Sequence, residues 1–266
     1  YWLSYPAMVK LCAAKPEFIP TTGANNYEIT RTDLESKITK KTRALVLNSP
    51  SNPTGCVYGR KELEFIAEVA VKNKFYVISD EIYEKLIYGG KEHVSIASLG
   101  KDIYDLTLTV NGVSKSYSMT GWRIGYAAGP LDVMTAIGDL QSHAASNPSS
   151  ISQRAALEAM TKDQSCLDKM RQEFGTRRDL MVSLVNSIDK MKCVNPDGAF
   201  YVFCDISATG MDSIKYANRL LDEAKVAVIP GGPFGADGCI RISFATGRGN
   251  IEKGMARIKE WMKKNG

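Results

Sequence analysis

The sequence of 266 residues has only two histidines, His93 and His143, and no two cysteines in a CxxC spacing. Structural zinc sites use closely spaced cysteines and histidines, and disulfide frameworks belong to short, cysteine-dense chains. We therefore predict no metal site, histidines that are structural or exposed, and reduced cysteines, several of them buried. The cysteines are Cys12, Cys56, Cys166, Cys193, Cys204 and Cys239.

Long hydrophobic runs are also missing. No apolar stretch approaches the roughly 18 to 20 residues that cross a bilayer, and the residues after Tyr1 do not resemble an export signal. We predict a globular cytoplasmic protein without membrane contacts. The chain opens on Tyr1-Trp2 with no initiator methionine, so we expect a segment of the protein to precede it.

The sequence has no long run of residues with the same charge. The net charge is +5 and the pI about 8.8, but lysines and arginines are interspersed with acidic residues. Because basic runs are typical of nucleic-acid binding, this pattern predicts no nucleic-acid partner. The positive balance suits phosphate and carboxylate ligands, and it is equally typical of an ordinary solvated surface.

The first part of the chain alternates between strand and helix patterns. Short apolar runs at 44–47, 75–78 and 106–110 are rich in β-branched or aromatic residues and predict buried parallel strands. A helix between the first two strands would complete a βαβ crossover, because its apolar residues recur at helical spacing. Those residues are Leu63, Ile66, Ala67 and Ala70.

The character of the sequence changes near residue 163. Helices are predicted from Leu131 to Ala145 and from Ile151 to Met160. Charged residues become more frequent over 162–192, which is typical of a long exposed helix that connects two domains. We expect a large domain over 1–163 and a small C-terminal domain over 164–266.

The second part predicts a smaller α+β unit. Strands are expected at 199–205, 226–229 and 239–244. Two helices should bury the stripes Ile214, Ala217, Leu221, Ala224 and Ile251, Met255, Ile258, Met262. The predicted fold class is α/β, a mostly parallel sheet with flanking helices followed by this smaller unit.

Each predicted parallel strand runs directly into a polar cluster. In open α/β sheets, ligands lie beyond the carboxyl ends of the strands, so side chains from these clusters should converge. This places five residues close together although they are far apart in sequence. They are Asn52, Asp80, Tyr83, Lys115 and Arg123.

The run from Gly112 to Gly125 combines Lys115 with Arg123 eight positions later. A lysine amine can form a Schiff base with an aldehyde, and a guanidinium can bind phosphate oxygens through two parallel hydrogen bonds. The spacing therefore suits a carbonyl cofactor that carries a phosphate. Taken alone, Lys115 would more often be a solvated surface residue, and Arg123 could pair with a local carboxylate.

The run Gly-Val-Ser-Lys-Ser-Tyr-Ser-Met-Thr-Gly-Trp-Arg-Ile-Gly resembles the lysine motif of class I/II, fold-type I, aminotransferases. Ser-Pro-Ser-Asn-Pro-Thr-Gly at 49–55 and Asp-Glu-Ile-Tyr at 80–83 match further motifs of the family in the same order, so the resemblance covers nearly the whole chain. It is greatest to the bacterial aspartate and prephenate aminotransferases. It implies the cofactor pyridoxal 5′-phosphate, bound in the large domain.

The resemblance implies a role for each converging residue. Asp80 would keep the pyridinium nitrogen protonated, and Tyr83 and Asn52 would hydrogen-bond the ring oxygen. Lys115 would hold the aldehyde as an internal aldimine and, once displaced by an amino acid, move the α-proton. Arg123 would bind the cofactor phosphate.

Three further roles rest on resemblance alone. Trp2 would stack on the cofactor ring and border the substrate, and Arg241 would bind the substrate α-carboxylate beside Asn52. Ser114 would contact the phosphate, although the family often carries a hydroxyl at the position of Gly112 instead.

Members of this family carry a segment before the position of Tyr1, with a loop that cradles the phosphate and part of the small domain. The resemblance therefore implies that the large domain is incomplete at its N-terminus and that the full protein is a homodimer. If the protein begins at Tyr1, we expect weak cofactor retention and an exposed apolar seam.

The predicted function is transfer of an amino group from an amino acid, aspartate or a related acidic or aromatic one, to a 2-oxo acid. One alternative is a carbon–sulfur β-lyase, which uses the same cofactor chemistry. Another is an aminotransferase-like regulatory domain behind a DNA-binding module.

Overall fold

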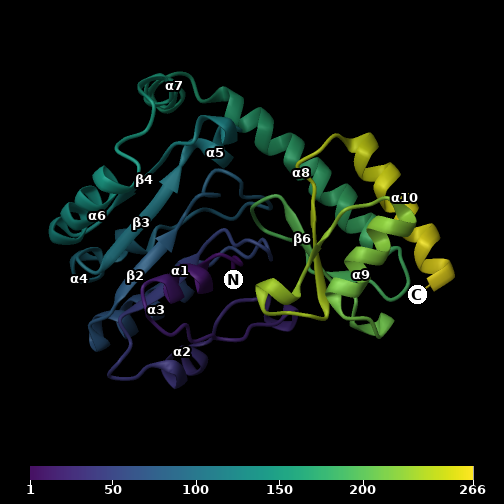
Figure 1. The fold of residues 1–266 in the computed structure, drawn as a ribbon, viewed down its shortest axis with the longest axis horizontal. Coiled ribbons are helices and arrows are strands. Elements are labelled where there is room, and N and C mark those ends of the chain that lie inside the picture. The colour runs from purple at the N-terminus through teal and green to yellow at the C-terminus, as the bar shows by residue number, and fades with distance from the viewer. Residues whose placement is uncertain (266) are drawn as a thin grey trace.

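The computed structural model describes residues 1–265, and it contains two separate four-stranded sheets with helices around them (Figure 1). One sheet is mostly parallel and the other is wholly antiparallel. The α/β fold class predicted from the sequence is confirmed.

The mostly parallel sheet has the order β1-β2-β3-β4. Its first three strands are parallel, and β4 pairs antiparallel with β3. The three predicted strands are confirmed within one or two residues at each end. The strands are β1 Ala44–Asn48, β2 Tyr76–Asp80, β3 Thr107–Gly112 and β4 Gly125–Ala128.

The helix α3, Arg60–Asn73, connects β1 to β2 and buries the predicted apolar face together with Val69. The amphipathic pattern fixes this face because residues three and four apart lie on one side of a helix. The other helices of residues 1–163 are α1 Tyr5–Leu11, η1 Gly23–Asn25, α2 Arg31–Lys37, η2 Ile96–Leu99, α4 Lys101–Tyr104, α5 Val113–Ser116, η3 Thr120–Trp122, α6 Leu131–Ala144 and α7 Ser150–Thr161.

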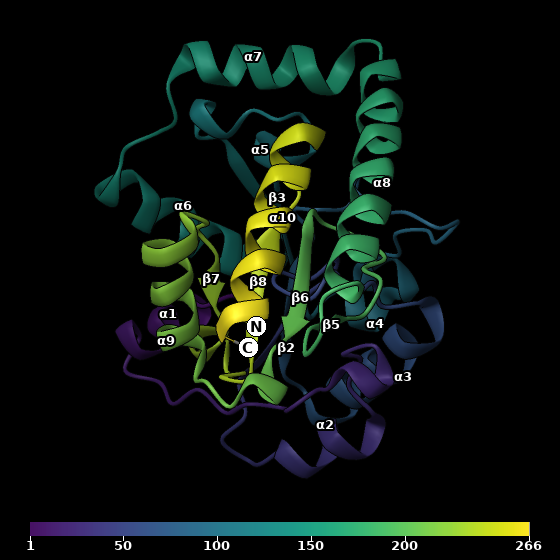
Figure 2. The ribbon, with the colours of Figure 1, turned by 90° about the vertical axis from the view of Figure 1, so that its right-hand side faces the viewer.

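The antiparallel sheet has the order β5-β6-β8-β7, with α8 and α10 lying over it (Figure 2). Its strands are β5 Lys192–Cys193, β6 Tyr201–Asp205, β7 Ile229–Pro230 and β8 Cys239–Ser243. The strand predicted at 226–229 is largely wrong, since only its last residue enters β7. The helices are α8 Ser165–Asn186, η4 Ser207–Thr209, α9 Ser213–Arg219, a π-turn η5 Leu220–Ala224, η6 Gly232–Phe234 and α10 Arg248–Asn265.

The predicted apolar stripe of α10 is confirmed, since all four residues are buried. The stripe predicted for 214–224 is wrong at two of its four positions, since Ala217 is buried and Ala224 packs against the core. Ile214 is 54% exposed and Leu221 48% exposed, whereas Tyr216 and Leu220 are fully buried. The Tyr216 ring meets Trp261 edge to face with centroids 5.2 Å apart. Burying this large ring sets the phase of the helix, and the π-turn after Arg219 then carries Leu221 outward.

The segment before β6 joins the two sheets. The Gly198 amide donates to the Gly55 carbonyl over 2.8 Å, and the Tyr88 amide donates to the Asp197 carbonyl over 2.8 Å. A side chain at Gly198 would place its Cβ 2.6 Å from Pro50, so only glycine allows this approach. The antiparallel sheet is thereby held against the loops that follow β1 and β2.

The helices α6 and α7 expose much apolar surface. No residue of α6 is buried, and α7 buries only Ala156. Leu131, Leu140 and Ile151 are 82%, 71% and 72% exposed. These side chains leave apolar surface exposed on both helices, and the seam predicted for a protein that begins at Tyr1 stays a prediction. Among the described residues, no helix is both long and apolar enough to cross a membrane.

Candidate active site

Asp80 is the last residue of β2, and both of its carboxylate oxygens accept hydrogen bonds. The Ile82 amide donates to Oδ1 over 3.2 Å, and the Tyr5 hydroxyl donates to Oδ2 over 2.5 Å. Burial raises the pKa of Asp80, and these two hydrogen bonds lower it in part. The carboxylate is therefore fixed in direction and largely removed from water.

Tyr5 was given no role by the sequence analysis. It stands in the first turn of α1, and its ring meets Trp2 edge to face with centroids 5.3 Å apart. Burial raises the pKa of Tyr5, so its hydroxyl stays a donor. The half-buried Trp2 thus lies beside the residue that holds Asp80. A tyrosine three positions after a tryptophan carries no signal by itself that it reaches a strand end 75 positions away.

The loop after β1 holds Asn52. The Asn48 side chain donates to the Asp80 carbonyl over 3.0 Å and accepts from the Asn52 amide over 2.8 Å. This single side chain ties the ends of β1 and β2 together. Asn52 itself is only 6% exposed, with its side-chain oxygen turned toward Arg241 of β8.

Arg241 donates to the Asn52 side-chain oxygen over 2.8 Å. Its guanidinium carbon lies 4.2 Å from the centre of the Tyr201 ring and 5.1 Å from that of Phe234. Its Nε is buried and has no hydrogen-bond partner, and burial lowers the pKa of the group. No carboxylate of residues 1–265 forms an ion pair with it. A half-buried guanidinium held by neutral groups is suited to binding an anion from outside.

Tyr83 is 3% exposed, and its hydroxyl lies 3.0 Å from that of Tyr201. Burial raises the pKa of Tyr83. Tyr201 also supports Arg241, so it is a second site residue that the sequence analysis missed. Its position on β6, in register with Ser243 of β8, becomes visible only when the strands pair.

Lys115 lies on the short helix α5, directly after β3. Its Nζ lies 5.8 Å from the centre of the Phe200 ring. Burial and the positive charges of Arg123 and Arg241 lower the pKa of Lys115. No carboxylate of the described residues pairs with it. The structure thus favours a lysine whose amine loses its proton more easily than a surface lysine does.

Arg123 and Ser114 flank Lys115 without forming a closed site. Arg123 is exposed and donates to the Thr120 carbonyl over 2.8 Å, and Ser114 is half-buried. A Cβ at Gly112 would lie 2.8 Å from the Ile124 carbonyl oxygen. A hydroxyl-bearing residue therefore does not fit at Gly112, and the hydroxyls next to Lys115 in the chain are those of Ser114 and the buried Ser116.

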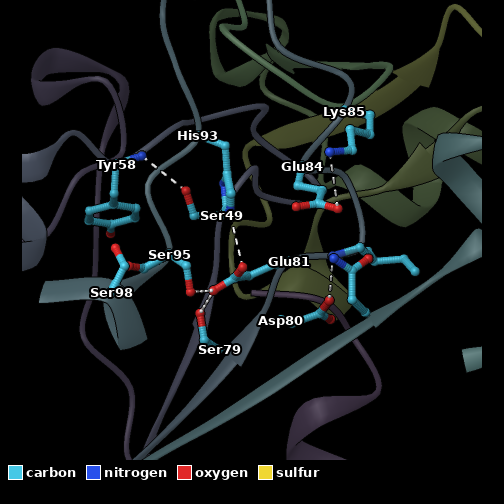
Figure 3. A network of polar contacts seen from close by, with 12 residues as sticks. Ser49, Tyr58, Ser79, Asp80, Glu81, Glu84, Lys85, His93, Ser95 and Ser98 are labelled. Carbon is cyan, nitrogen blue, oxygen red and sulfur yellow. Dashed lines mark hydrogen bonds and ion pairs between the residues drawn. The ribbon is translucent and has the colours of Figure 1, made fainter. Parts of the chain in front are cut away.

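A buried carboxylate network supports the end of β2 next to Asp80 (Figure 3). Glu81 is 3% exposed and accepts hydrogen bonds from Ser79 and Ser95, and its other oxygen lies 2.8 Å from His93 Nε2. His93 thus has a partner that its sequence position did not suggest. Glu84 lies close enough to Glu81 and His93 for a shared ion, but Ser79, Ser95 and His93 already take three of the lone-pair positions of the Glu81 carboxylate.

The sequence profile of the family "Aminotransferase class I and II" matches residues 1–258. The chain belongs to this family. The chain is 49% identical to the aspartate aminotransferase of Bacillus sp. (strain YM-2), over 99% of the chain and 68% of that protein. It is 43% identical to the aspartate aminotransferase of Bacillus subtilis (strain 168), over 100% of the chain and 69% of that protein.

Solved aminotransferases share the fold. The aspartate aminotransferase from Rhizobium meliloti superposes with a TM-score of 0.96 at 38% identity, covering 100% of this chain and 69% of that one. The aromatic aminotransferase from Pyrococcus horikoshii OT3 gives a TM-score of 0.95 at 39% identity, covering 99% of this chain and 71% of that one. The resemblance found in the sequence motifs is therefore confirmed over the whole chain.

Proposed function

We propose that this aminotransferase homologue moves an amino group from aspartate, or a related acidic or aromatic amino acid, to a 2-oxo acid. The observation that carries the proposal is Arg241, a half-buried cation with a buried, unpartnered Nε and no carboxylate partner among residues 1–265. Amino acids and 2-oxo acids share an α-carboxylate, and the planar fork of arginine matches it. The similarity to proteins named aspartate aminotransferases supports an acidic amino acid as the substrate.

The proposal includes pyridoxal 5′-phosphate as the cofactor, and the residues present fit it. Asp80 offers a fixed carboxylate for the ring nitrogen, Trp2 an aromatic face, and Lys115 a free amine. Arg123 and Ser114 would bind the phosphate, and Tyr83 and Asn52 would bind the ring oxygen. When bound, the cofactor supplies a carbonyl for covalent attachment of the amine and a ring that accepts an electron pair.

Lys115 does the proton transfer in this proposal. Its lowered pKa increases the share of neutral amine, which can accept the α-proton of the substrate and, in the second half of the reaction, deliver a proton to the α-carbon of the product amino acid. Arg241 and Asn52 hold the substrate carboxylate so that the α-carbon faces this amine. The rings of Phe200, Tyr201 and Phe234 keep water away and strengthen these charge interactions.

The test is to reduce the protein with borohydride in the presence of pyridoxal phosphate and to map the modified peptide. The pyridoxyl group should be found on Lys115. Amino transfer from aspartate to 2-oxoglutarate should fall by at least about 10²-fold in Lys115→Ala, the lower end of typical general acid–base contributions. Lys85→Ala, at a 46% exposed lysine, is the matched control and should keep wild-type activity.

A different product would overturn the aminotransferase assignment. If a β-substituted amino acid yields pyruvate and ammonia and no amino group reaches the 2-oxo acid, the enzyme is a β-lyase with the same attachment to Lys115. If borohydride labels Lys115 no faster than Lys85, the proposed attachment site is wrong.

We also propose that residues 1–163 and 164–266 form separate domains and that the enzyme is a cytoplasmic homodimer. The turn between α7 and α8, at 162–164, separates the chain regions that build the two sheets. The exposed apolar residues of α6 and α7 support a second copy as the partner, and six unpaired cysteines support a reducing compartment. Leu140→Lys should weaken dimerisation in sedimentation equilibrium, whereas Lys264→Ala should not.

A further inference from the structure

Cys193 and Cys204 are directly opposite each other in the antiparallel sheet. Cys193 ends β5, the edge strand, and its register partner on β6 is Cys204. Opposed residues of an antiparallel pair point to the same face of the sheet, so the two thiols lie side by side. Neither has a role in the proposed transfer reaction.

The hydrogen-bond pattern brings these two residues to the shorter cross-strand spacing. The Cys193 amide donates to the Asn186 side-chain oxygen over 3.0 Å, so it is not exchanged with the Cys204 carbonyl. Non-hydrogen-bonded pairs in antiparallel sheets have Cα atoms about 4.5 Å apart. Disulfides span Cα separations of about 4.4–6.8 Å, so the spacing typical of such a pair lies at the lower end of the range that a disulfide can bridge.

The two thiols differ in accessibility. Cys204 is 0% exposed and packs in the core beneath α8 and α10, whereas Cys193 is only partly buried at the sheet edge. The neighbouring Cys204 thiol lowers the pKa of Cys193, and burial raises the pKa of Cys204. An oxidant from solvent would therefore react first with the Cys193 thiol, and the Cys204 thiol is the neighbour that can react with the oxidised sulfur.

The other cysteines are placed differently. Cys239 is opposite Asp205, the neighbour of Cys204, so it points to the other face of the sheet. Cys56 is buried in the core of the mostly parallel sheet, and Cys12 and Cys166 are exposed without a cysteine opposite them in either sheet. The register therefore selects one pair among the six thiols.

We propose that Cys193 and Cys204 form a reversible cross-strand disulfide when the protein meets hydrogen peroxide. The Cys193 sulfur attacks one peroxide oxygen, the O–O bond breaks, and water leaves, giving a sulfenic acid. The Cys204 sulfur then attacks the Cys193 sulfur, and the hydroxyl leaves as a second water. Two thiols are oxidised to one disulfide, one peroxide is reduced to two waters, and a dithiol reductant reverses the change.

The disulfide would close a ring that contains a contact segment of the site. Residues 193–204 include Asp197, whose carboxylate lies 2.7 Å from Lys91 Nζ, and Gly198, which bonds to Gly55. They also include Tyr201, which supports Arg241. Cross-linking both ends of this segment restricts it in the unfolded chain, which raises resistance to denaturant.

The test treats the full chain with hydrogen peroxide, traps the remaining thiols with N-ethylmaleimide, and maps peptides without reduction. We expect a Cys193–Cys204 cross-linked peptide, a mass loss of about 2 Da for the two hydrogens removed, and full recovery of both thiols with dithiothreitol. The urea midpoint of the oxidised wild type should lie above that of the reduced form.

Two variants separate this pair from general oxidation. Cys193→Ser should abolish the cross-linked peptide and the midpoint shift, whereas Cys239→Ser should keep both. Cys204→Ser should leave Cys193 as a single thiol that accumulates sulfenic acid, detectable by a dimedone adduct. The proposal is overturned if peroxide modifies Cys12 and Cys166 while the Cys193 and Cys204 peptides stay separate, or if the cross-link joins Cys204 to Cys239.

Discussion

The Arg241 guanidinium donates a 2.8 Å hydrogen bond to the side-chain oxygen of Asn52, a residue 189 positions earlier in the chain. The two residues come from different sheets, Arg241 from β8 and Asn52 from the loop after β1. This bond fixes a half-buried cation where the two sheets meet, within electrostatic reach of Lys115. The position of the arginine thus depends on both parts of the chain.

We predict that Arg241→Lys raises the KM for the amino-acid substrate by about 10- to 100-fold with a smaller effect on kcat. Hydrogen bonds to charged groups contribute about 1.5–3 kcal/mol each, and lysine cannot replace the second bond of the fork. Steady-state kinetics with aspartate measure the split. Arg257→Lys, at an exposed arginine of α10, is the matched control. An unchanged KM would mean that the substrate carboxylate binds elsewhere.

Arg123→Gln should shift the reactivity of Lys115 to higher pH. The positive charge of Arg123 helps to lower the pKa of Lys115, so removing it raises that pKa and leaves less neutral amine at any given pH. The rate of acetylation by acetic anhydride, followed across pH 6–10 at about unit steps by peptide mapping, reports the neutral fraction. The profile of Lys85 in the same digest should not move. A Lys115 profile that shifts downward would contradict the electrostatic argument.

Tyr5→Phe should weaken cofactor binding most at low pH. The hydrogen bond from Tyr5 lowers the pKa of Asp80, so its loss raises that pKa and protonates the carboxylate at a higher pH. Since the ring nitrogen needs an ionised partner, the acid limb of pyridoxal phosphate binding should move to higher pH, with affinity reduced by about tenfold. Fluorescence titration at several pH values measures both effects.

The control for Tyr5→Phe is Tyr104→Phe, which removes a hydroxyl from a 61% exposed ring. It should leave the titration unchanged. An acid limb that stays in place in Tyr5→Phe, despite normal folding by circular dichroism, would show that Tyr5 does not tune Asp80.

The adjacent leucines at 220 and 221 test the corrected helix phase. Leu220 is fully buried and Leu221 is 48% exposed. Leu220→Ala should lower the free energy of unfolding by about 2–5 kcal/mol through lost packing and the cavity left behind. Leu221→Ala should change it by about 0.5 kcal/mol or less. Urea denaturation of both variants measures this difference, and equal losses of unfolding free energy would contradict the burial of Leu220 and the exposure of Leu221.

Much of the site could be predicted because its residues follow strand ends. Asn48 and Asp80 end β1 and β2, and Lys115 follows β3 closely, so three local strand predictions place their polar residues at one sheet edge. Tyr5 and Tyr201 could not be predicted in this way. Each reaches the site from an element whose position depends on packing against distant parts of the chain.

The two predicted helical stripes of residues 164–266 show where hydrophobic periodicity succeeds and where it fails. In α10 the apolar residues have one favourable phase, and the structure buries them as expected. In α9 two phases compete, and the choice is made by Tyr216, which fills a core space beside Trp261 and the sulfur of Met262. Periodicity cannot rank the two phases because it does not contain the shape of the opposing surface.

The sequence by itself determined the alternation of strands and helices, the polar clusters at the strand ends and the lysine motif of the aminotransferases. These features are local, since each depends on backbone preference and hydrophobic period within a short window. The tertiary structure alone decided the Asn52–Arg241 bond, the Tyr5–Asp80 bond and the pairing of Cys193 with Cys204. Such contacts form only when separate elements bury their apolar faces together, because that packing fixes which distant side chains meet.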